Sequence, residues 1–269
     1  MSDAAIRGII DLNRYPVDAP DSEQGRALIA RCRAALDDRA LCALPGFVHP
    51  EAVARMARDA EALAPEAFRY DRPRIAYEYS EENWPAGHPR TVEHPCRYRQ
   101  LLNYQIPNDS PVRDIYLWEP LREFLRRVLG YDELHRSACP HLALTIQISG
   151  PEDCNGWHFD GTDAVFSLLL QMPVSGGAFE YAPYLRSKDE ENYEAVAATF
   201  ADPDRHARRP EIATGTFTLF KGDESLHRVT QVGEGPMPRI IALFSFDRTP
   251  NQIYQQQYID ELRGRVGTA

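Results

Sequence analysis

Two histidines and one aspartate in this chain have the types and the order of a metal site. His158 and Asp160 stand two residues apart, and Trp157 and Phe159 are their neighbours. Side chains alternate along an extended strand, so His158 and Asp160 are expected on one face and the two aromatic residues on the other. A second imidazole, from His227, would complete the set of two histidines and one carboxylate that binds Fe(II) and leaves positions open for other ligands. The sequence therefore predicts a non-haem iron site.

The surroundings of the two motifs strengthen this prediction. A His-x-Asp pair is weak by itself, because a chain with eight histidines often has one by chance. Here an apolar run at 164–170 follows the pair, and a second run at 216–220 precedes His227, as expected for buried strands. Arg239 begins a third apolar run, twelve residues after His227. A buried guanidinium at that position could hold a dicarboxylate through two hydrogen bonds.

These motifs resemble those of Fe(II)/2-oxoglutarate-dependent oxygenases, and within them the BesD/HalD-type branch of free-amino-acid halogenases and hydroxylases. The resemblance extends from about Cys96 to Asp247. Its landmarks are Arg97-Tyr98-Arg99, the segments 105–110, 156–160, 176–181 and 189–193, and Ser225-Leu226-His227-Arg228-Val229-Thr230. It implies that His158, Asp160 and His227 bind Fe(II). It also implies that Arg239 binds the 2-oxoglutarate carboxylate and that O2 is the other co-substrate.

Asp160 departs from the halogenases of this branch, which carry glycine at that position. A halogenase needs an iron position that is free for chloride, and a carboxylate ligand fills it. The chain therefore resembles a hydroxylase, which would hydroxylate an unactivated C–H bond of a small polar substrate and release succinate and CO2. A free amino acid is the expected substrate, and desaturation or ring closure are the alternative outcomes of the same chemistry.

A free amino acid needs a cation for its carboxylate and acids for its amines. The candidates for the cation are Arg97 and Arg99, and those for the acid are Asp163, Glu180 and Asp247. Each of these residues could instead form an ion pair within the scaffold.

Further candidates come from the neighbours of the predicted ligands. Asn155 and Trp157 flank the first iron ligand and could orient the substrate or the ligand itself. If Arg239 points into the barrel, strand alternation also points Ile241, Leu243, Ser245 and Asp247 inward.

The periodicity of the chain changes near residue 140. Before it, helices are expected from Asp21 or Ser22 to about Asp38, over 50–63 and over 120–129, with a short strand at 41–47. From 141 to Asp247 the chain reads as strands separated by Gly/Pro turns. This pattern predicts a mainly β fold with flanking helices, a double-stranded β-helix (jelly-roll, cupin-like) core at 141–250 and an N-terminal helical scaffold at 1–140.

Three segments lie outside this regular pattern. An insert at 186–214 carries a short helix at about 191–200 and is expected to help cover the mouth of the barrel. The polar, aromatic and proline-rich segment 64–95 is either a surface loop or a lid. The tail, 251–269, has a possible helix at 255–262 and could pack on the body or on another subunit in a homodimer.

Composition narrows the class of protein. Residues 1–269 are expected to form a single domain, and 43% hydrophobic residues can build its core. A net charge of -10 argues against nucleic acid as a partner. Five cysteines without a CxxC pair predict reduced thiols in a cytoplasmic protein. The chain has no signal-peptide pattern and no run of eighteen apolar residues, so neither export by that route nor membrane insertion is expected.

Two alternatives belong to other functional classes. An oxygenase of peptides or carrier-bound substrates would need an open groove, whereas the long segments 64–95 and 186–214 favour an enclosed small substrate. A non-catalytic jelly-roll module would bind a ligand or a partner without turnover. Arg239 argues against that module, because a buried guanidinium without an anionic partner is costly.

Overall fold

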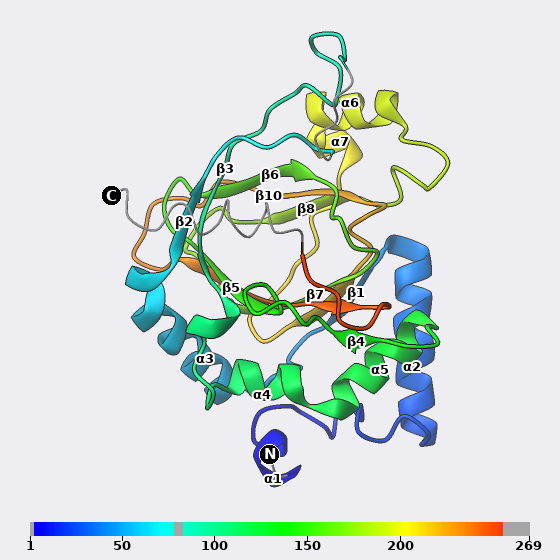
Figure 1. Ribbon diagram of the computed structural model, residues 1–269, viewed down its shortest axis with the longest axis vertical. Helices are drawn as coiled ribbons and strands as arrows, with labels where there is room; N and C mark the ends of the chain where they lie inside the picture. Colours follow the sequence, from blue (N-terminus) through cyan, green and yellow to red (C-terminus); the bar gives the residue numbers. More distant parts are fainter. Residues whose placement is uncertain (1–2, 78–82, 255–269) are drawn as a thin grey trace.

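One antiparallel sheet of ten strands forms the centre of the molecule (Figure 1). The computed structural model describes residues 3–77 and 83–254. The strand order is β1-β9-β7-β11-β5-β3-β6-β10-β8, with β2 paired to β3, and β12 forms a separate ribbon with β4. The strands are β1 (Leu41–Leu44), β2 (Phe68–Asp71), β3 (Cys96–Leu101), β4 (His135–Arg136), β5 (Leu144–Ser149), β6 (Cys154–His158), β7 (Val165–Gln171), β8 (Phe179–Ala182), β9 (Phe217–Phe220), β10 (Leu226–Val229), β11 (Arg239–Phe244) and β12 (Phe246–Asp247).

The sheet curls back on itself. Phe179 and Tyr181 of β8, the last strand of the order, contact Phe220 of β9, next to the first strand, with ring centroids 5.2 and 5.5 Å apart. The curvature encloses an interior between β3, β6, β10 and β8 on one side and β5, β11, β7 and β9 on the other (Figure 1). The predicted jelly-roll core is confirmed.

Helices cover one outer face of the curled sheet (Figure 1). Their apolar side chains pack with Ile240, Ala242 and Phe244 of β11 in the main hydrophobic core. The helix at 23–39 begins as predicted, with the Ser22 hydroxyl accepting from Gly25 N at 3.0 Å. The helices of the N-terminal half are α1 (Asp3–Arg7), α2 (Glu23–Arg39), α3 (Pro50–Leu63), η1 (Ala64–Glu66), η2 (Asn103–Gln105), α4 (Pro111–Leu117) and α5 (Glu119–Leu129).

The division of the chain at residue 140 is less sharp than the sequence predicted. Strands β1, β2 and β3 all come from the expected helical scaffold, and β3 lies between β5 and β6 in the middle of the sheet. The segment 64–95 also contains an unpredicted strand, β2. Its residues alternate between half-buried and exposed positions, so they carry little apolar signal. Pairing with β3, not local propensity, makes this segment extended.

The insert between β8 and β9 contains α6 (Tyr193–Ala201) and α7 (Pro203–His206). Val196 of α6 packs against Trp157, Leu226 and Ala182 in a second, smaller core. These residues lie on the outer face of β6, β10 and β8, so α6 covers that face. Coverage of the mouth by the rest of the insert stays a prediction. Figure 1 shows α6 and α7 above these three strands. The helix expected at 255–262 lies outside the described residues.

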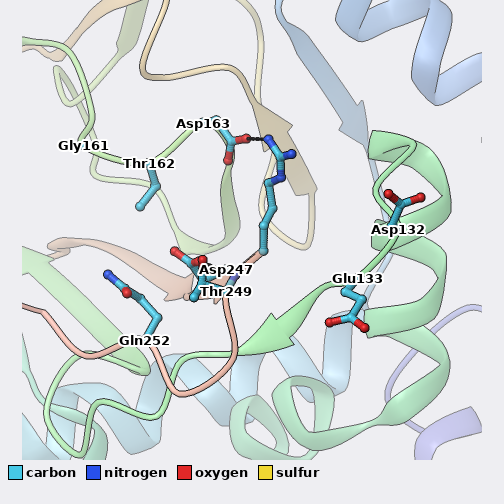
Figure 2. A pocket seen from close by; sticks show the side chains of 9 residues that line it. Asp132, Glu133, Gly161, Thr162, Asp163, Asp247, Thr249 and Gln252 are labelled. Carbon is cyan, nitrogen blue, oxygen red and sulfur yellow. Dashed lines mark hydrogen bonds and ion pairs between the residues drawn. The ribbon is translucent and has the colours of Figure 1, made fainter.

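A pocket of about 630 Å³ opens between the β6–β7 loop and the segment that follows β11. Figure 2 shows its lining, which contains four carboxylates and one guanidinium. The lining residues are Asp132, Glu133, Gly161, Thr162, Asp163, Asp247, Arg248, Thr249 and Gln252. One of its lining residues, Gly161, directly follows Asp160 in the chain.

All five cysteines are buried and free of disulfides. Among the described residues, no helix has the length and the apolar character needed to cross a bilayer.

Candidate iron centre

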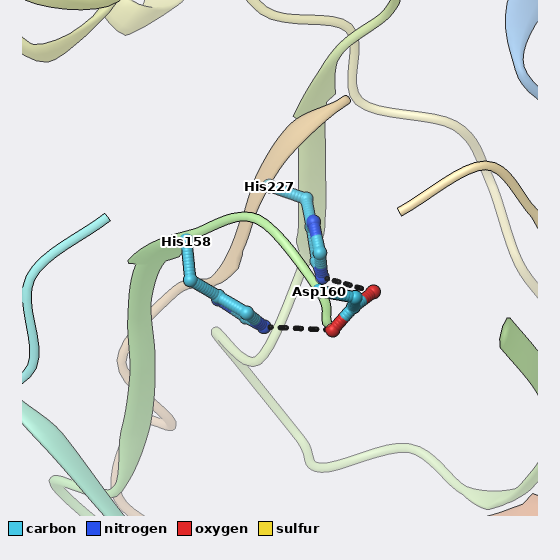
Figure 3. Close-up of side chains that lie close together, drawn as sticks. All are labelled: His158, Asp160 and His227. Carbon is cyan, nitrogen blue, oxygen red and sulfur yellow. Dashed lines mark ion pairs between the residues drawn. The ribbon is translucent and has the colours of Figure 1, made fainter. Parts of the chain in front are cut away.

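The two histidines and the aspartate predicted as ligands lie together inside the curled sheet. His158 ends β6 and is the direct cross-strand partner of His227 on β10. Figure 3 shows the Asp160 carboxylate facing both rings. Asp160 Oδ1 lies 3.6 Å from His158 Nε2, and Oδ2 lies 3.3 Å from His227 Nε2. Two such ligands about 2.1 Å from one first-row metal ion are at most about 4.2 Å apart, so these spacings suit a shared ion.

Asp160 lies in the irregular segment that follows β6, two residues beyond the end of the strand on which the sequence predicted it. Strand β6 stops at His158, and the backbone N–H of Asp160 donates to Gly222 O at 2.9 Å. The alternation predicted for the neighbours holds, because Trp157 and Phe159 pack together in the outer core. The carboxylate thereby lies beside both imidazoles, as the distances above show.

Both imidazoles have the same hydrogen-bonding arrangement. His158 Nδ1 lies 2.8 Å from Gly156 O, and His227 Nδ1 lies 2.9 Å from Ser225 O. A carbonyl oxygen can only accept, so each Nδ1 carries the proton and each Nε2 keeps its lone pair. These carbonyls fix the tautomer and the orientation that a metal ligand needs.

The site has the electrostatics of a metal centre. Burial lowers the pKa of both His158 and His227, so the rings are neutral and able to coordinate. Asp160 Oδ2 is buried and has no hydrogen-bond partner among the described residues. A buried carboxylate oxygen facing two neutral imidazole nitrogens needs a cation, and a divalent metal fits this set of donors.

Arg239 lies at the start of β11, inside the barrel. It is 6% exposed, its Nε has no hydrogen-bond partner, and no carboxylate of the described residues pairs with it. Burial lowers the pKa of Arg239 to about 10, still well above neutral pH, so the guanidinium stays charged. The predicted alternation holds next to it, since Ile240 belongs to the outer core and Ile241 does not. An unpaired cation in this position favours an anionic ligand.

Arg74 is a second cation at the site, one that was not predicted from the sequence. Its NH1 donates to Asn155 Oδ1 at 3.0 Å, and its buried Nε has no partner among the described residues. Its charge contributes to the lowered pKa of His158 and His227. Arg74 comes from the irregular segment that follows β2, where no periodicity signals which side chains turn inward.

A β-bulge brings Asn155 to the same face as His158. His227 of β10 pairs with His158 of β6, and Val229 pairs with Asn155. An advance of two residues on β10 therefore corresponds to three residues on β6, which is a bulge in β6. Asn155 thereby joins His158 on the interior face despite an odd spacing. Its position supports the prediction that Asn155 belongs to the surroundings of the site.

Four other predicted substrate contacts lie on the outer face of the sheet. Arg97 and Arg99 share one face of β3, as expected, but Arg99 pairs with Ile148 of the outer core, and both side chains reach exposed backbone carbonyls. Glu180 is opposite Arg228 and binds both Arg228 and Arg209 at 2.7 Å. The Arg228 guanidinium lies 4.6 Å from the centre of the Trp157 ring, which also faces outward.

The remaining candidates lie at or near the acidic pocket. Asp163 accepts a 2.6 Å hydrogen bond from the Tyr131 hydroxyl and lies 3.7 Å from Arg248. Asp247 lines the same pocket, with its carboxylate accepting from Thr249 N at 2.7 Å. The Ser245 hydroxyl is 2.8 Å from the Tyr254 hydroxyl.

Several solved structures share this fold. The epimerase SnoN, in complex with Fe3+, alpha ketoglutarate and nogalamycin RO, has a TM-score of 0.55 and 15% identity over 91% of this chain and 93% of its own. AviO1 from Streptomyces viridochromogenes gives 0.53 and 17% identity over 82% and 95%. A 2OG-Fe(II) oxygenase family protein from Burkholderia pseudomallei gives 0.50 and 16% over 82% and 91%. At these identities the likeness concerns the fold, which is that of 2-oxoglutarate oxygenases.

The sequence comparison identifies the family. The model of the halogenase D family matches residues 24–258, so the chain belongs to that family. It is an enzyme, an Fe(II)/2-oxoglutarate-dependent oxygenase. A comparison with curated proteins gives no match.

Proposed function

We propose that this enzyme hydroxylates a C–H bond of a free amino acid, with iron held by His158, Asp160 and His227. The observation that carries the proposal is the position of the Asp160 carboxylate, 3.6 and 3.3 Å from the two imidazole nitrogens. A carboxylate there occupies the metal position that a halogenase leaves free for chloride. Within a family named for halogenation, this residue favours hydroxylation.

Each group of the site has a distinct part in this proposal. Bound iron with 2-oxoglutarate supplies the oxidising chemistry. The two histidines present Nε2 to the metal because their Nδ1 protons are bound to backbone carbonyls. Arg239 binds the distal carboxylate of 2-oxoglutarate. This carboxylate supplies the anionic partner that the buried Arg239 guanidinium lacks within the protein. The protein thereby orients the co-substrate and excludes water from it.

Charges near the triad favour an amino acid as the substrate. Arg74 places an incompletely paired guanidinium beside Asn155 and close enough to lower the pKa of both histidines. The pocket whose lining includes Gly161 has four carboxylates and one guanidinium. This excess of negative charge suits a cationic amine. The carboxylate of a zwitterion would pair with Arg74 beside Asn155, and its amine would pair with the acids of this pocket. Asn155 can orient the substrate, and Asp163 and Asp247 are the two predicted acids that line this pocket.

Anaerobic titration tests the substrate class. Free amino acids are added one at a time to the Fe(II)/2-oxoglutarate complex, and the charge-transfer band is followed for perturbation. We expect one or a few amino acids with an amine or another polar side chain to shift the band. A response only to peptides or carrier-bound substrates would overturn the proposal. The mass of the product formed from the responding compound then distinguishes hydroxylation from desaturation or ring closure.

The Asp160→Gly variant tests the reaction outcome. Wild type with its substrate and excess chloride should give hydroxylated product, because Asp160 fills the position that chloride would need. Asp160→Gly should lose most or all hydroxylation and chlorinate at most weakly, since halogen transfer also needs the substrate carbon close to the halide. Mass spectrometry of the products measures both. Mainly chlorinated product from wild type would mean that Asp160 is not a lasting ligand.

The Arg74→Leu variant tests the substrate cation. Loss of a hydrogen bond to a charged group costs about 1.5–3 kcal/mol, which corresponds to a rise of roughly 10- to 150-fold in the KM of the amino acid. The apparent constant for 2-oxoglutarate should stay within about twofold. A substrate analogue without its carboxylate should bind wild type and variant equally. A larger rise in the apparent constant for 2-oxoglutarate than in the KM of the amino acid would mean that Arg74 binds the co-substrate.

A further inference from the structure

Gly222 is in direct contact with the carboxylate of Asp160. It belongs to the turn Lys221-Gly222-Asp223-Glu224, which leads from β9 towards His227. A Cβ atom built on Gly222 would lie 1.8 Å from Asp160 Oδ2, 2.8 Å from Cγ and 3.1 Å from Cβ. All three distances are well inside the optimum of about 3.5–4.0 Å for nonbonded heavy atoms. The carboxylate thus occupies the space that any side chain at position 222 would need.

Backbone conformation does not explain the glycine. Gly222 is absent from the residues with positive φ, so its backbone is open to alanine. Its carbonyl oxygen accepts from Asp160 N at 2.9 Å, an interaction that alanine would keep. The requirement at position 222 is therefore for space beside Asp160.

A small rotation of the carboxylate would not relieve the contact. Turning about the Cβ–Cγ bond moves the two oxygens but leaves Cγ in place, 2.8 Å from the added carbon. Relief needs rotation about Cα–Cβ, which takes the whole carboxylate out of its position between His158 and His227. A methyl group at position 222 and a ligating carboxylate at position 160 therefore exclude one another.

We infer that Gly222 is a positioning residue, which sets whether Asp160 can serve as the third iron ligand. This inference rests on the proposed role of the triad and adds a determinant outside it. The two positions act as a pair, because a carboxylate at 160 requires glycine at 222. A glycine at 160 removes that requirement.

A double-mutant cycle on metal binding tests the inference. Gly222→Ala should weaken anaerobic Fe(II) binding by at least about 10- to 100-fold, the range seen when groups that orient a ligand are lost. The loss should match that of Asp160→Gly. Adding Gly222→Ala to Asp160→Gly should change the affinity by less than about twofold, because the atoms that clash are gone. Equal losses in both backgrounds, or wild-type affinity in Gly222→Ala, would overturn the inference.

Thermal unfolding of the metal-free protein gives a second readout, one that is independent of iron. Gly222→Ala should lower the unfolding midpoint in the wild-type background by about 2–10 °C. It should have little effect beside Asp160→Gly. Gly150→Ala is the matched control, because an added Cβ there meets nothing within 4 Å and its φ is not positive.

The two readouts separate failure of the inference from failure of the proposed site. If wild type did not bind Fe(II), the triad assignment would fall while the unfolding cycle would still measure the contact of Gly222 with Asp160. If wild type bound Fe(II) and the unfolding cycle showed no coupling, the role of Gly222 would fall and the triad would stand.

Discussion

Replacement of His158 or His227 by alanine should abolish both iron binding and turnover. Each imidazole presents a fixed Nε2 to the same point, and Asp160 lies within 3.6 Å of both. Two remaining protein ligands cannot impose the facial geometry, so the ion is lost to water and buffer. The expected loss is the largest of any substitution in the chain.

Anaerobic titration with Fe(II) and the metal-dependent rise in the unfolding midpoint both measure this loss. A metal at 100 times its Kd stabilises the folded protein by about 2.7 kcal/mol, and the alanine variants should show none of that gain. His206→Ala is the control, because His206 is exposed on α7. An alanine variant of His158 or His227 that kept one equivalent of iron and its activity would refute the site.

Replacement of Arg239 by leucine should raise the apparent constant for 2-oxoglutarate by roughly 30- to several-thousand-fold. Truncation of one partner of a buried, hydrogen-bonded charge pair costs about 2–5 kcal/mol. Arg239 meets the condition for such a pair, because it is 6% exposed and has no anionic partner among the described residues. Arg239→Lys should give an intermediate constant, since lysine keeps the charge but not the two parallel hydrogen bonds.

Steady-state kinetics with varied 2-oxoglutarate measures this effect, and Fe(II) binding should be unchanged. Arg99→Leu is the matched control, an arginine on the exposed outer face of β3. An unchanged apparent constant for 2-oxoglutarate in Arg239→Leu would mean that another cation binds the co-substrate. Arg74 is then the first alternative, because it is the other guanidinium near the triad.

The sequence by itself predicted the clustering of His158, Asp160 and His227 and the burial of Arg239, both of which the structure shows. His158 and Asp160 lie so close in the chain that any turn or strand keeps them together, and His227 sits between apolar runs that had to be buried. The inward direction of Arg239 followed from the alternation of Ile240, Ala242 and Phe244, which joined the outer core. Local spacing and the burial of apolar residues were enough for these predictions.

The tertiary structure alone decided which other side chains surround the triad. Alternation placed Arg97 and Arg99 on one face, but their pairing with β5 and β6 made that face the outer one. The bulge in β6 turned Asn155 inward, and an irregular segment brought Arg74 beside it.

The place of Gly222 beside Asp160 was also decided by the tertiary structure, because the two residues are 62 positions apart in the chain. Strand register, bulges and loop paths depend on contacts between distant segments. A one-residue shift in register exchanges the inner and outer faces of a strand, and spacing within a single segment cannot reveal that choice.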